Sequence, residues 1–334
     1  AGELIKEGDR VAGAIVQTQD GPVRVRAKRG VVLATGGFPH DIARRAKLYP
    51  HAPTGAEHWS PTPEGNTGDG IKLAASLGAT TADELPNAAA WVPVSRVPRR
   101  DGSFGVFPHF IDRAKPGVIA VTRAGTRFVN EGNCYHDFCQ ALVKAHKNLP
   151  GEICAWLICD HPTLRRYGLG HVKPFPVPIA HQLKNGYLKR GKTLAELAKV
   201  CGIDPVAFER TVAEFNKHAR KGEDPQFGKG STAYNRYLGD PTVTPNPCVA
   251  PVETGPFYAV QLVIGDLGSF AGLKADAQAR VLDSTTGQPI PGLYAAGNDM
   301  ASIMGGNYPG GGITLGPAMT FGYIAGRHAA GVTD

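Results

Sequence analysis

A glycine-rich stretch near the C-terminus combines bare backbone with a single phenol. Residues 305–316 read Gly-Gly-Asn-Tyr-Pro-Gly-Gly-Gly-Ile-Thr-Leu-Gly, and Tyr308 stands inside this segment. Glycines let backbone N–H groups approach a flat or anionic ligand closely. The spacing predicts a helix over 317–330, with Thr314 as its cap and Pro317 in its first turn, and a helix N-terminus favours an oxygen that is or becomes anionic. A tight turn before a core helix is the simpler interpretation of the loop alone.

Two apolar runs that end in glycine must position this loop. Residues 30–38 form a continuous apolar run that closes on Thr35-Gly-Gly37, and residues 290–298 repeat the pattern up to Gly297. Such runs are typical of strands buried on both faces of a sheet, whose carboxyl ends bind ligands in open α/β folds. Between them, Thr67-Gly-Asp-Gly70 opens a short predicted helix with Thr67 or Asp69 as cap, although a plain capped junction from loop to helix is the simpler interpretation of this segment alone.

Other segments show ordinary local signals. Asp20-Gly21 predicts a hairpin between two alternating strands, and 257–264 reads as another strand. Thr193 opens a capping box before one helix, and Asp204-Pro205 starts a longer one. Residues 84–118 are rich in proline, glycine and aromatic residues, which indicates a second lobe whose aromatics either line an apolar pocket or pack in the core.

Composition excludes several classes of function. The 334 residues exceed one typical domain, and the net charge of +7 is spread thinly without a basic, aromatic-interleaved surface, so we expect no nucleic-acid partner. No apolar stretch is long enough to predict a membrane span. No zinc-binding spacing occurs, so we expect no metal site and free thiols of a cytoplasmic protein at Cys134, Cys139, Cys154, Cys159, Cys201 and Cys248.

Five motifs, taken in order, resemble the FAD flavoproteins of the fumarate reductase/succinate dehydrogenase type. They are Ala34-Thr-Gly-Gly37, Thr67-Gly-Asp-Gly70, Gly125-x-Arg-Phe-Val-Asn-Glu131, Gly292-Leu-Tyr-Ala-Ala-Gly297 and the loop at 305–312. Within that superfamily, the loop and Asn130-Glu-x-x-x-Tyr135 resemble the 3-ketosteroid dehydrogenases. The resemblance implies an α/β fold with an incomplete, two-segment Rossmann-like FAD-binding domain (1–92 and 257–334) and an inserted α+β substrate domain (93–256).

The resemblance also implies roles for particular residues. Tyr135 would take a proton from the carbon beside a ketone, while Tyr308 and the Gly312 N–H would hold the ketone oxygen and stabilise the enolate, with hydride passing to flavin N5. A packed aromatic with a bonded hydroxyl is the alternative for Tyr135. FAD would be held at Ala34, Thr35, Gly36, Gly37, Thr67, Gly68, Asp69, Gly297, Asn298, Gly311, Gly312, Thr314 and Leu315.

One expected element of this family is missing. The pyrophosphate-binding G-x-G-x-x-G turn occurs nowhere in the sequence. We therefore expect either a fragment of a longer protein or a chain completed by a separate N-terminal FAD-binding partner.

Three functions remain open at this stage. The first is α,β-desaturation of a ketosteroid-like, hydrophobic cyclic ketone. The second is reduction of an enoate such as fumarate or urocanate, for which Arg127 and His136 are the candidate cationic clamp, although Arg127 reads more readily as structural. The third is a catalytic-lobe subunit that completes a partner chain carrying FAD.

Overall fold

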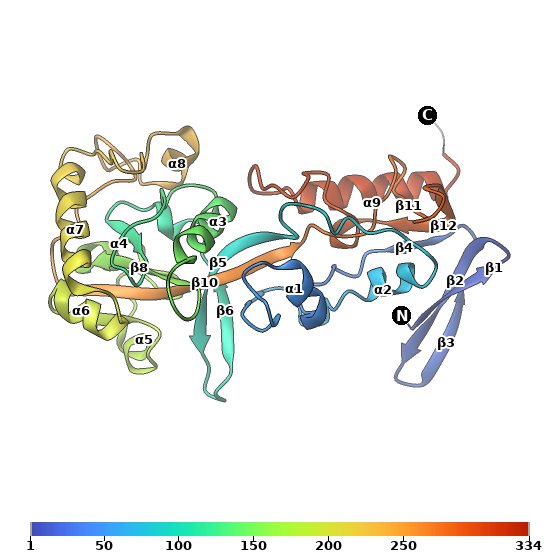
Figure 1. Ribbon diagram of the computed structural model, residues 1–334, viewed down its shortest axis with the longest axis horizontal. Coiled ribbons are helices and arrows are strands. Elements are labelled where there is room, and N and C mark those ends of the chain that lie inside the picture. Colours follow the sequence, from blue (N-terminus) through green and yellow to red (C-terminus); the bar gives the residue numbers. More distant parts are fainter. Residues whose placement is uncertain (1, 333–334) are drawn as a thin grey trace. The chain divides into compact units, whose positions relative to one another are not determined.

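The computed structural model describes residues 2–332 as a mixed α/β protein in two compact units (Figure 1). Unit 1 comprises Ala1–Ala56, Thr62–Ala90 and Asp266–Asp334, of which residues 1, 333 and 334 lie outside the described part. Unit 2 comprises Glu57–Pro61 and Trp91–Gly265. Two long strands, β5 (Ala89–Pro98) and β10 (Phe257–Ser269), carry the chain from one unit into the other.

Unit 1 contains two three-stranded sheets. β1 (Glu3–Glu7), β2 (Arg10–Thr18) and β3 (Gly21–Arg26) are antiparallel, and the predicted Asp20-Gly21 turn joins β2 to β3. The second sheet has the order β11 (Arg280–Leu282), β12 (Pro289–Ala295), β4 (Val31–Leu33). β12 and β4 run parallel, with Leu293 opposite Val31, so both glycine-ended runs finish at the same edge of one sheet.

β4 differs from its prediction as a strand buried on both faces. Leu33 is buried, but Val32 is 42% exposed. β4 occupies an end of its sheet among the described residues, and one of its faces is left uncovered there. The continuous apolar run therefore predicted the strand correctly and its two-sided burial wrongly.

The helices of unit 1 are α1 (Ile42–Leu48), α2 (Asp69–Ala75), α9 (Leu315–Ala329) and the short η2 (Gly297–Asp299). Neither predicted side-chain cap forms at α2 or α9. Gly68 occupies the N-cap of α2, and the Thr67 hydroxyl donates to the Asp69 side chain at 2.9 Å instead. Thr314 stands at the N-cap of α9 without a side-chain hydrogen bond.

The solvent side of α9 is unusually apolar. Leu315, Met319 and Tyr323 follow one another at intervals of four residues and are all exposed. In a globular domain, an apolar stripe of this kind on a helix is commonly buried against another element.

Unit 2 is built on one sheet with the order β6 (Phe104–Pro108), β5, β10, β8 (Cys154–Asp160), β7 (Val118–Val121), and β9 (Lys189–Gly191) also pairs with β10. β10 and β8 are antiparallel, with Phe257 opposite Asp160. The helical elements are η1 (Asp112–Ala114), α3 (Tyr135–His146), α4 (His161–Tyr167), α5 (Ala180–Lys184), α6 (Leu194–Cys201), α7 (Pro205–Ala219) and α8 (Ala233–Leu238).

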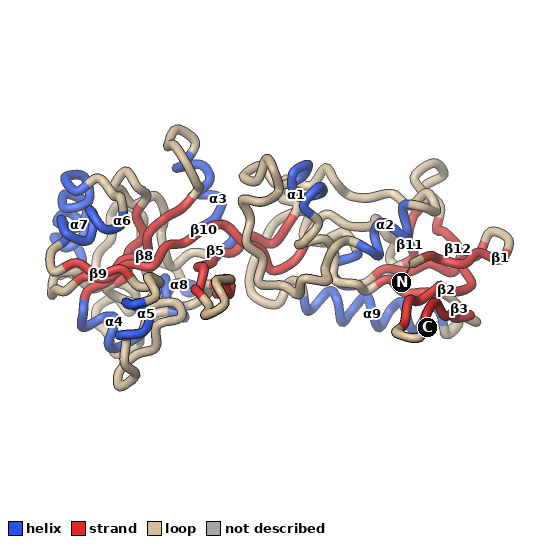
Figure 2. The backbone as a smooth tube through the Cα atoms, turned by 90° about the horizontal axis from the view of Figure 1, so that it is seen from below, coloured by secondary structure: helices blue, strands red, loops and turns tan. Residues whose placement is uncertain are grey.

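The caps predicted in unit 2 are confirmed. The Thr193 hydroxyl accepts from the Glu196 N–H at 3.1 Å, and the Asp204 carboxylate accepts from the Ala207 N–H at 2.9 Å. α6 and α7 lie side by side (Figure 2). Together with one face of the sheet they enclose a core that includes Ile119, Ile158, Leu197, Phe208, Val212 and Phe215.

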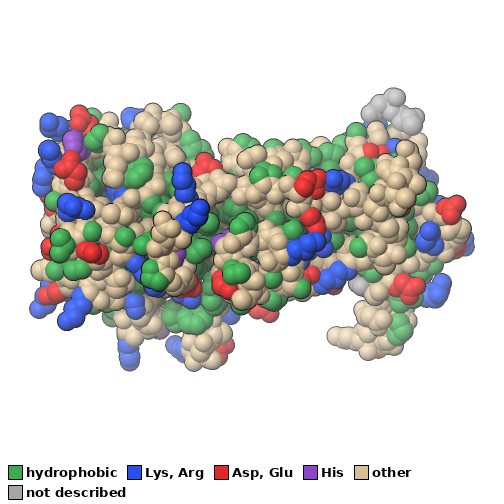
Figure 3. All heavy atoms as spheres, viewed as in Figure 1, with side chains coloured by type: hydrophobic (Ala, Val, Ile, Leu, Met, Phe, Trp, Pro, Cys, Tyr) green, Lys and Arg blue, Asp and Glu red, His purple; other side chains and the backbone are tan. Residues whose placement is uncertain are grey.

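Lys and Arg side chains lie scattered among acidic ones on the face shown in Figure 3. The six cysteines are free and buried. Across residues 2–332, the structure contains no helix long and apolar enough to cross a membrane and no cluster of side chains suited to a metal ion.

Candidate functional site

One buried carboxylate in unit 1 draws together three predicted cofactor segments. Asp299, at the end of η2, accepts from the Thr35 N–H, from the Thr35 hydroxyl at 3.0 Å and from the Gly37 N–H at 3.1 Å. The Thr35 hydroxyl in turn accepts from the Gly70 N–H at 3.1 Å. Segments 34–37, 67–70 and 297–299 therefore meet at one place, and Gly297 and Asn298 lie directly beside Asp299 in sequence.

Asp299 itself was not predicted from the sequence. Burial raises the pKa of its carboxyl, while the hydrogen bonds from Thr35 and Gly37 favour the charged form. A Cβ at Gly70 would lie 2.7 Å from the Asp299 carboxylate, so this contact also explains the glycine. The only local feature of the sequence that could have indicated this role is the position of Asp299, an acidic residue shortly after a strand that ends in glycine.

We expect Asp299→Ala to disrupt this junction. The substitution leaves the Thr35 and Gly37 donors unpaired, and each buried unpaired donor costs about 1–3 kcal/mol. Denaturant unfolding and the amount of flavin retained per chain measure the effect. Asp283→Ala is the matched control, because Asp283 also accepts from two main-chain N–H groups and a hydroxyl, but in a solvent-accessible turn where water can replace it. Equal losses in the two variants would contradict the assignment.

The glycine-rich loop combines a buried phenol with open backbone. Tyr308 is buried, and its ring stacks on Phe270 with centroids 6.2 Å apart. The Asn87 side chain donates to the Gly306 carbonyl at 2.8 Å and fixes the start of the loop. No atom lies within 4 Å of the positions that a Cβ would take at Gly310, Gly311 or Gly312, so the backbone faces open space there.

A small cavity joins the loop to the end of β12. Its wall brings together the predicted residues Gly297, Asn298 and Thr314 with Ser269, Phe270, Ser302, Ile313, Pro317 and Phe321. Leu315 is exposed on α9. Bare glycine backbone, a helix N-terminus and a glycine-lined strand end fit a flat cofactor with anionic groups.

In unit 2, Tyr135 is the first residue of α3 and is 7% exposed. Its ring makes an edge-to-face contact with Phe110, with centroids 5.3 Å apart. The turn that leads into Tyr135 is shaped by Asn130, whose side-chain oxygen accepts from the Gly132 N–H at 2.9 Å. Asn130 also donates to Asn235 at 2.8 Å, which attaches this turn to α8.

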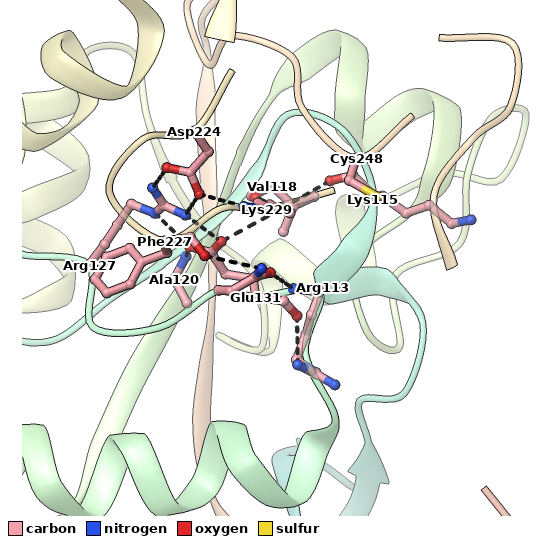
Figure 4. A network of polar contacts seen from close by, with 12 residues as sticks. Arg113, Lys115, Val118, Ala120, Arg127, Glu131, Asp224, Phe227, Lys229 and Cys248 are labelled. Carbon is pink, nitrogen blue, oxygen red and sulfur yellow. Dashed lines mark hydrogen bonds and ion pairs between the residues drawn. The ribbon is translucent and has the colours of Figure 1, made fainter. Parts of the chain in front are cut away.

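The guanidinium of Arg127 is paired with carboxylates inside unit 2, as Figure 4 shows. Its guanidinium donates to both oxygens of Glu131 at 2.8 and 2.7 Å and to both oxygens of Asp224 at 2.7 and 2.9 Å. Phe215 and Phe227 lie about the guanidinium, each with its centroid near 5 Å from Cζ. Two carboxylates therefore neutralise Arg127, which supports the structural interpretation over a substrate clamp.

Lys229 completes this buried charge network. Its ammonium donates to the Val118 carbonyl and to the Lys115 carbonyl at 3.4 Å, and it lies 3.9 Å from Glu131. Burial lowers the pKa of Lys229 to about 8, against the pull of Glu131. Burial alone would raise the pKa of Glu131, but Arg127 and Lys229 hold it below its usual value. The network thus carries two cations and two carboxylates.

His136, the second candidate clamp, is held in its neutral form. The main-chain N–H of Trp91 donates to the Nδ1 of His136 at 3.1 Å, and the two rings stack with an interplanar angle of 7°. Burial lowers the pKa of His136 to about 4. A neutral imidazole at physiological pH offers no charge to a carboxylate substrate.

We expect His136 to make unit 2 sensitive to acid. The folded state keeps His136 neutral down to a pKa of about 4, whereas the unfolded chain protonates near 6.5, so stability falls as pH decreases through this window, by roughly 3 kcal/mol in total. Urea unfolding at pH 7 and pH 4.5 measures the loss. His136→Asn removes the titration but keeps an oxygen for the Trp91 N–H, so its loss should be smaller by about 2–3 kcal/mol. The exposed His181→Asn is the control, and a wild-type-like loss in His136→Asn would contradict the prediction.

Comparison with known proteins agrees with these features. Residues 1–315 match the family described as FAD binding domain. The chain is 43% identical over 328 residues to a 4-oxocyclohex-2-ene-1-carboxylate 5-dehydrogenase of Sinomonas cyclohexanicum, covering 98% of this chain and 55% of that protein. It is 40% identical over 332 residues to a 3-oxosteroid 1-dehydrogenase of Mycolicibacterium smegmatis, covering 97% and 57%.

A solved structure is similar over nearly the whole chain. The crystal structure of 3-ketosteroid Δ1-dehydrogenase from Sterolibacterium denitrificans, in complex with 1,4-androstadiene-3,17-dione, matches with a TM-score of 0.90 at 40% identity and covers 99% of this chain and 59% of that one.

The chain therefore belongs to the FAD binding domain family, whose cofactor is FAD. Among members of that family it is similar to dehydrogenases named for 3-oxosteroids and for an oxocyclohexene carboxylate, which confirms the resemblance drawn from the motifs. The chain spans little more than half the length of these relatives.

Proposed function

We propose that this chain is the larger part of an FAD-dependent dehydrogenase that introduces a C=C bond beside the ketone of a hydrophobic cyclic substrate. The main support is the presence of both predicted tyrosines in defined settings. Tyr135 starts α3 against Phe110, and Tyr308 is buried in a loop whose glycines leave the backbone open. The named relatives act on cyclic ketones, which supports the same substrate class here.

The two units divide the work in this proposal. Unit 1 is the incomplete Rossmann-like FAD-binding domain, and unit 2 is the inserted substrate domain. FAD is held by segments 34–37, 67–69, 297–298 and 311–315. In support, 34–37 and Gly70, which follows the second segment, gather at Asp299, and the other two segments line the cavity beside it. When bound, FAD supplies the acceptor for the hydride that leaves the substrate.

Side chains and backbone of the protein bind the ketone oxygen of the substrate and accept the proton that its neighbouring carbon loses. The Tyr308 hydroxyl and the Gly312 N–H donate to the ketone oxygen and stabilise the negative charge that develops on it. Tyr135, in its ionised phenolate form, takes the proton from the carbon next to the ketone and becomes a neutral phenol. An enolate forms only when both occur together, because a ketone acidifies its neighbouring C–H through stabilisation of the oxyanion.

Enoate reduction is the less favoured alternative. It requires a cationic clamp for a carboxylate, and the two candidates are unsuited to that task. Arg127 is paired with Glu131 and Asp224, and burial keeps His136 neutral.

We further propose that additional polypeptide completes unit 1 and covers the apolar stripe of α9. The stripe Leu315, Met319 and Tyr323 is exposed, β4 leaves Val32 open, and the sequence contains no G-x-G-x-x-G turn. The additional polypeptide is either the rest of a longer protein or a separate FAD-binding chain. The six free thiols are consistent with work in the cytoplasm.

The deciding experiment combines a visible spectrum, intact mass and two assays on the purified protein. We expect bound flavin only when the chain is produced together with its completing polypeptide, and then dye-coupled oxidation of a 3-oxosteroid or a 4-oxocyclohexane carboxylate. Reduction of fumarate by a reduced dye, without oxidation of either ketone, would overturn the proposal. A homogeneous, yellow 334-residue chain would overturn the need for a partner.

A further inference from the structure

Arg113, in η1, is a fully buried arginine whose hydrogen bonds all go to main-chain carbonyls among the described residues. Its Nε donates to the His109 carbonyl at 3.1 Å. Nη1 donates to the Glu131 carbonyl at 2.7 Å, and both terminal nitrogens donate to the Asn133 carbonyl at 3.2 Å. Its Cζ also lies 4.9 Å from the centroid of the Phe138 ring.

The groups that Arg113 contacts lie in the segments around Tyr135. His109 immediately precedes Phe110, whose ring packs against Tyr135. Glu131 and Asn133 belong to the turn that enters α3, four and two residues before Tyr135, and Phe138 follows one helical turn later. A single guanidinium thus connects the packing partner of Tyr135, the turn before it and the helix after it (Figure 4 shows Arg113 beside Glu131).

The surrounding contacts hold each end of this arrangement in place. His109 donates or accepts at both ring nitrogens, with Asp112 at 2.6 Å and Ser95 at 2.8 Å, which ties the Phe110 segment to β5. The Glu131 side chain is fixed by Arg127 and by the Ala120 N–H at 3.0 Å. Arg113 is the group that joins these two anchored segments to each other.

Burying a guanidinium is costly, and burial lowers the pKa of Arg113 while the nearby Asp112 opposes that shift. Methionine or leucine would fill the same volume without that cost. What an apolar residue cannot do is fix several carbonyls in a planar, directional pattern.

We propose that Arg113 is a positioning residue that sets the location of the Tyr135 hydroxyl. This inference rests on the proposed function, because it gives the base of that reaction its support. In this role Arg113 contacts neither substrate nor cofactor. It acts through the turn, the ring of Phe110 and the first turn of α3.

The kinetic test uses the complete FAD-bearing enzyme with Arg113→Met, Arg113→Lys and Tyr135→Phe. We expect Arg113→Met to lower kcat by about 10- to 100-fold with KM changed less than about twofold, since small misplacements of a reacting group cost rate rather than binding. Arg113→Lys should restore part of kcat. Arg165→Met is the matched control, because Arg165 also donates to a carbonyl, that of Val177, and packs on the Phe175 ring, but away from α3.

A second readout does not depend on activity. In protein labelled with 3-fluorotyrosine, Tyr135→Phe identifies the ¹⁹F resonance of Tyr135, and Tyr294→Phe identifies a reference in unit 1. We expect Arg113→Met to shift or broaden the Tyr135 resonance and leave that of Tyr294 unchanged. If Arg113→Met does not fold, Arg113→Lys carries the same comparison.

The outcomes separate the two proposals. Suppose that the wild-type enzyme is active and that Tyr135→Phe abolishes this activity. If the Arg113 variants then keep a normal kcat and an unchanged Tyr135 resonance, only the positioning role of Arg113 is overturned. If the Arg113 variants shift the Tyr135 resonance while the wild-type enzyme oxidises no cyclic ketone, the positioning of Tyr135 is supported and the proposed reaction is overturned.

Discussion

Replacing Tyr135 by phenylalanine should lower the kcat for desaturation of a cyclic ketone by about 10²- to 10⁴-fold, the usual contribution of a positioned general base. The substitution removes one oxygen and leaves the edge-to-face packing on Phe110 available. Stability should change little, so the loss would be chemical. Steady-state kinetics of the complete enzyme, with thermal unfolding alongside, measures both quantities.

A phenol elsewhere in the same unit is the control for this prediction. Tyr237, on α8, is 85% exposed, and Tyr237→Phe should leave kcat unchanged. A Tyr135→Phe enzyme with wild-type turnover would return Tyr135 to the interpretation as a packed aromatic. Exchange of the substrate's α-hydrogens with heavy water would then show whether another group removes the proton.

Replacing Glu131 by glutamine should destabilise unit 2 by about 3–5 kcal/mol, the typical cost of breaking a buried ion pair from one side. The network drawn in Figure 4 balances Arg127 and Lys229 against Glu131 and Asp224. Glutamine keeps the shape and leaves two buried cations with one carboxylate. Denaturant unfolding followed by the fluorescence of the tryptophans, which all lie in unit 2, measures the change.

An exposed ion pair in the same unit provides the comparison. Lys217 lies 3.9 Å from Glu214 on the solvent side of α7, and Lys217→Met should cost no more than about 1 kcal/mol. If Glu131→Gln were equally mild, the network would be far better hydrated than its burial indicates.

Signals that act over a few residues were predicted well from the sequence. Asp20-Gly21, the Thr193 capping box and Asp204 each depend on partners within four positions, and each forms as expected. The alternation and the apolar runs likewise predicted β2, β3, β4, β10 and β12, whereas β5, β6, β8 and β9 were missed. The order of the motifs identified the family, which the match to the FAD binding domain model confirms.

Features that depend on distant partners were missed or were wrong. Asp299 lies 264 positions from Thr35, and Arg113 is 20 positions from Asn133, so no local pattern announces either contact. The expected cap by Thr67 or Asp69 failed because those two side chains bond to each other. β4 was expected to be buried on both faces, but Val32 is exposed. Burial of a strand depends on the elements that pack against it, and an apolar run alone does not specify them.

The pairing of β4 with β12 and the hydrogen bonds that Thr35 donates to Asp299 have a consequence for synthesis on the ribosome. Thr35 leaves the exit tunnel long before Asp299 is translated, and all of 91–265 emerges in between. At about 5–20 residues per second, the delay is roughly 10 to 50 seconds. The β2–β3 hairpin can form at once, and unit 2 can fold as it emerges. During this delay β4, the apolar strand that precedes Thr35-Gly-Gly37, has no β12 to pair with. We expect chaperones to bind the nascent chain mainly in this period.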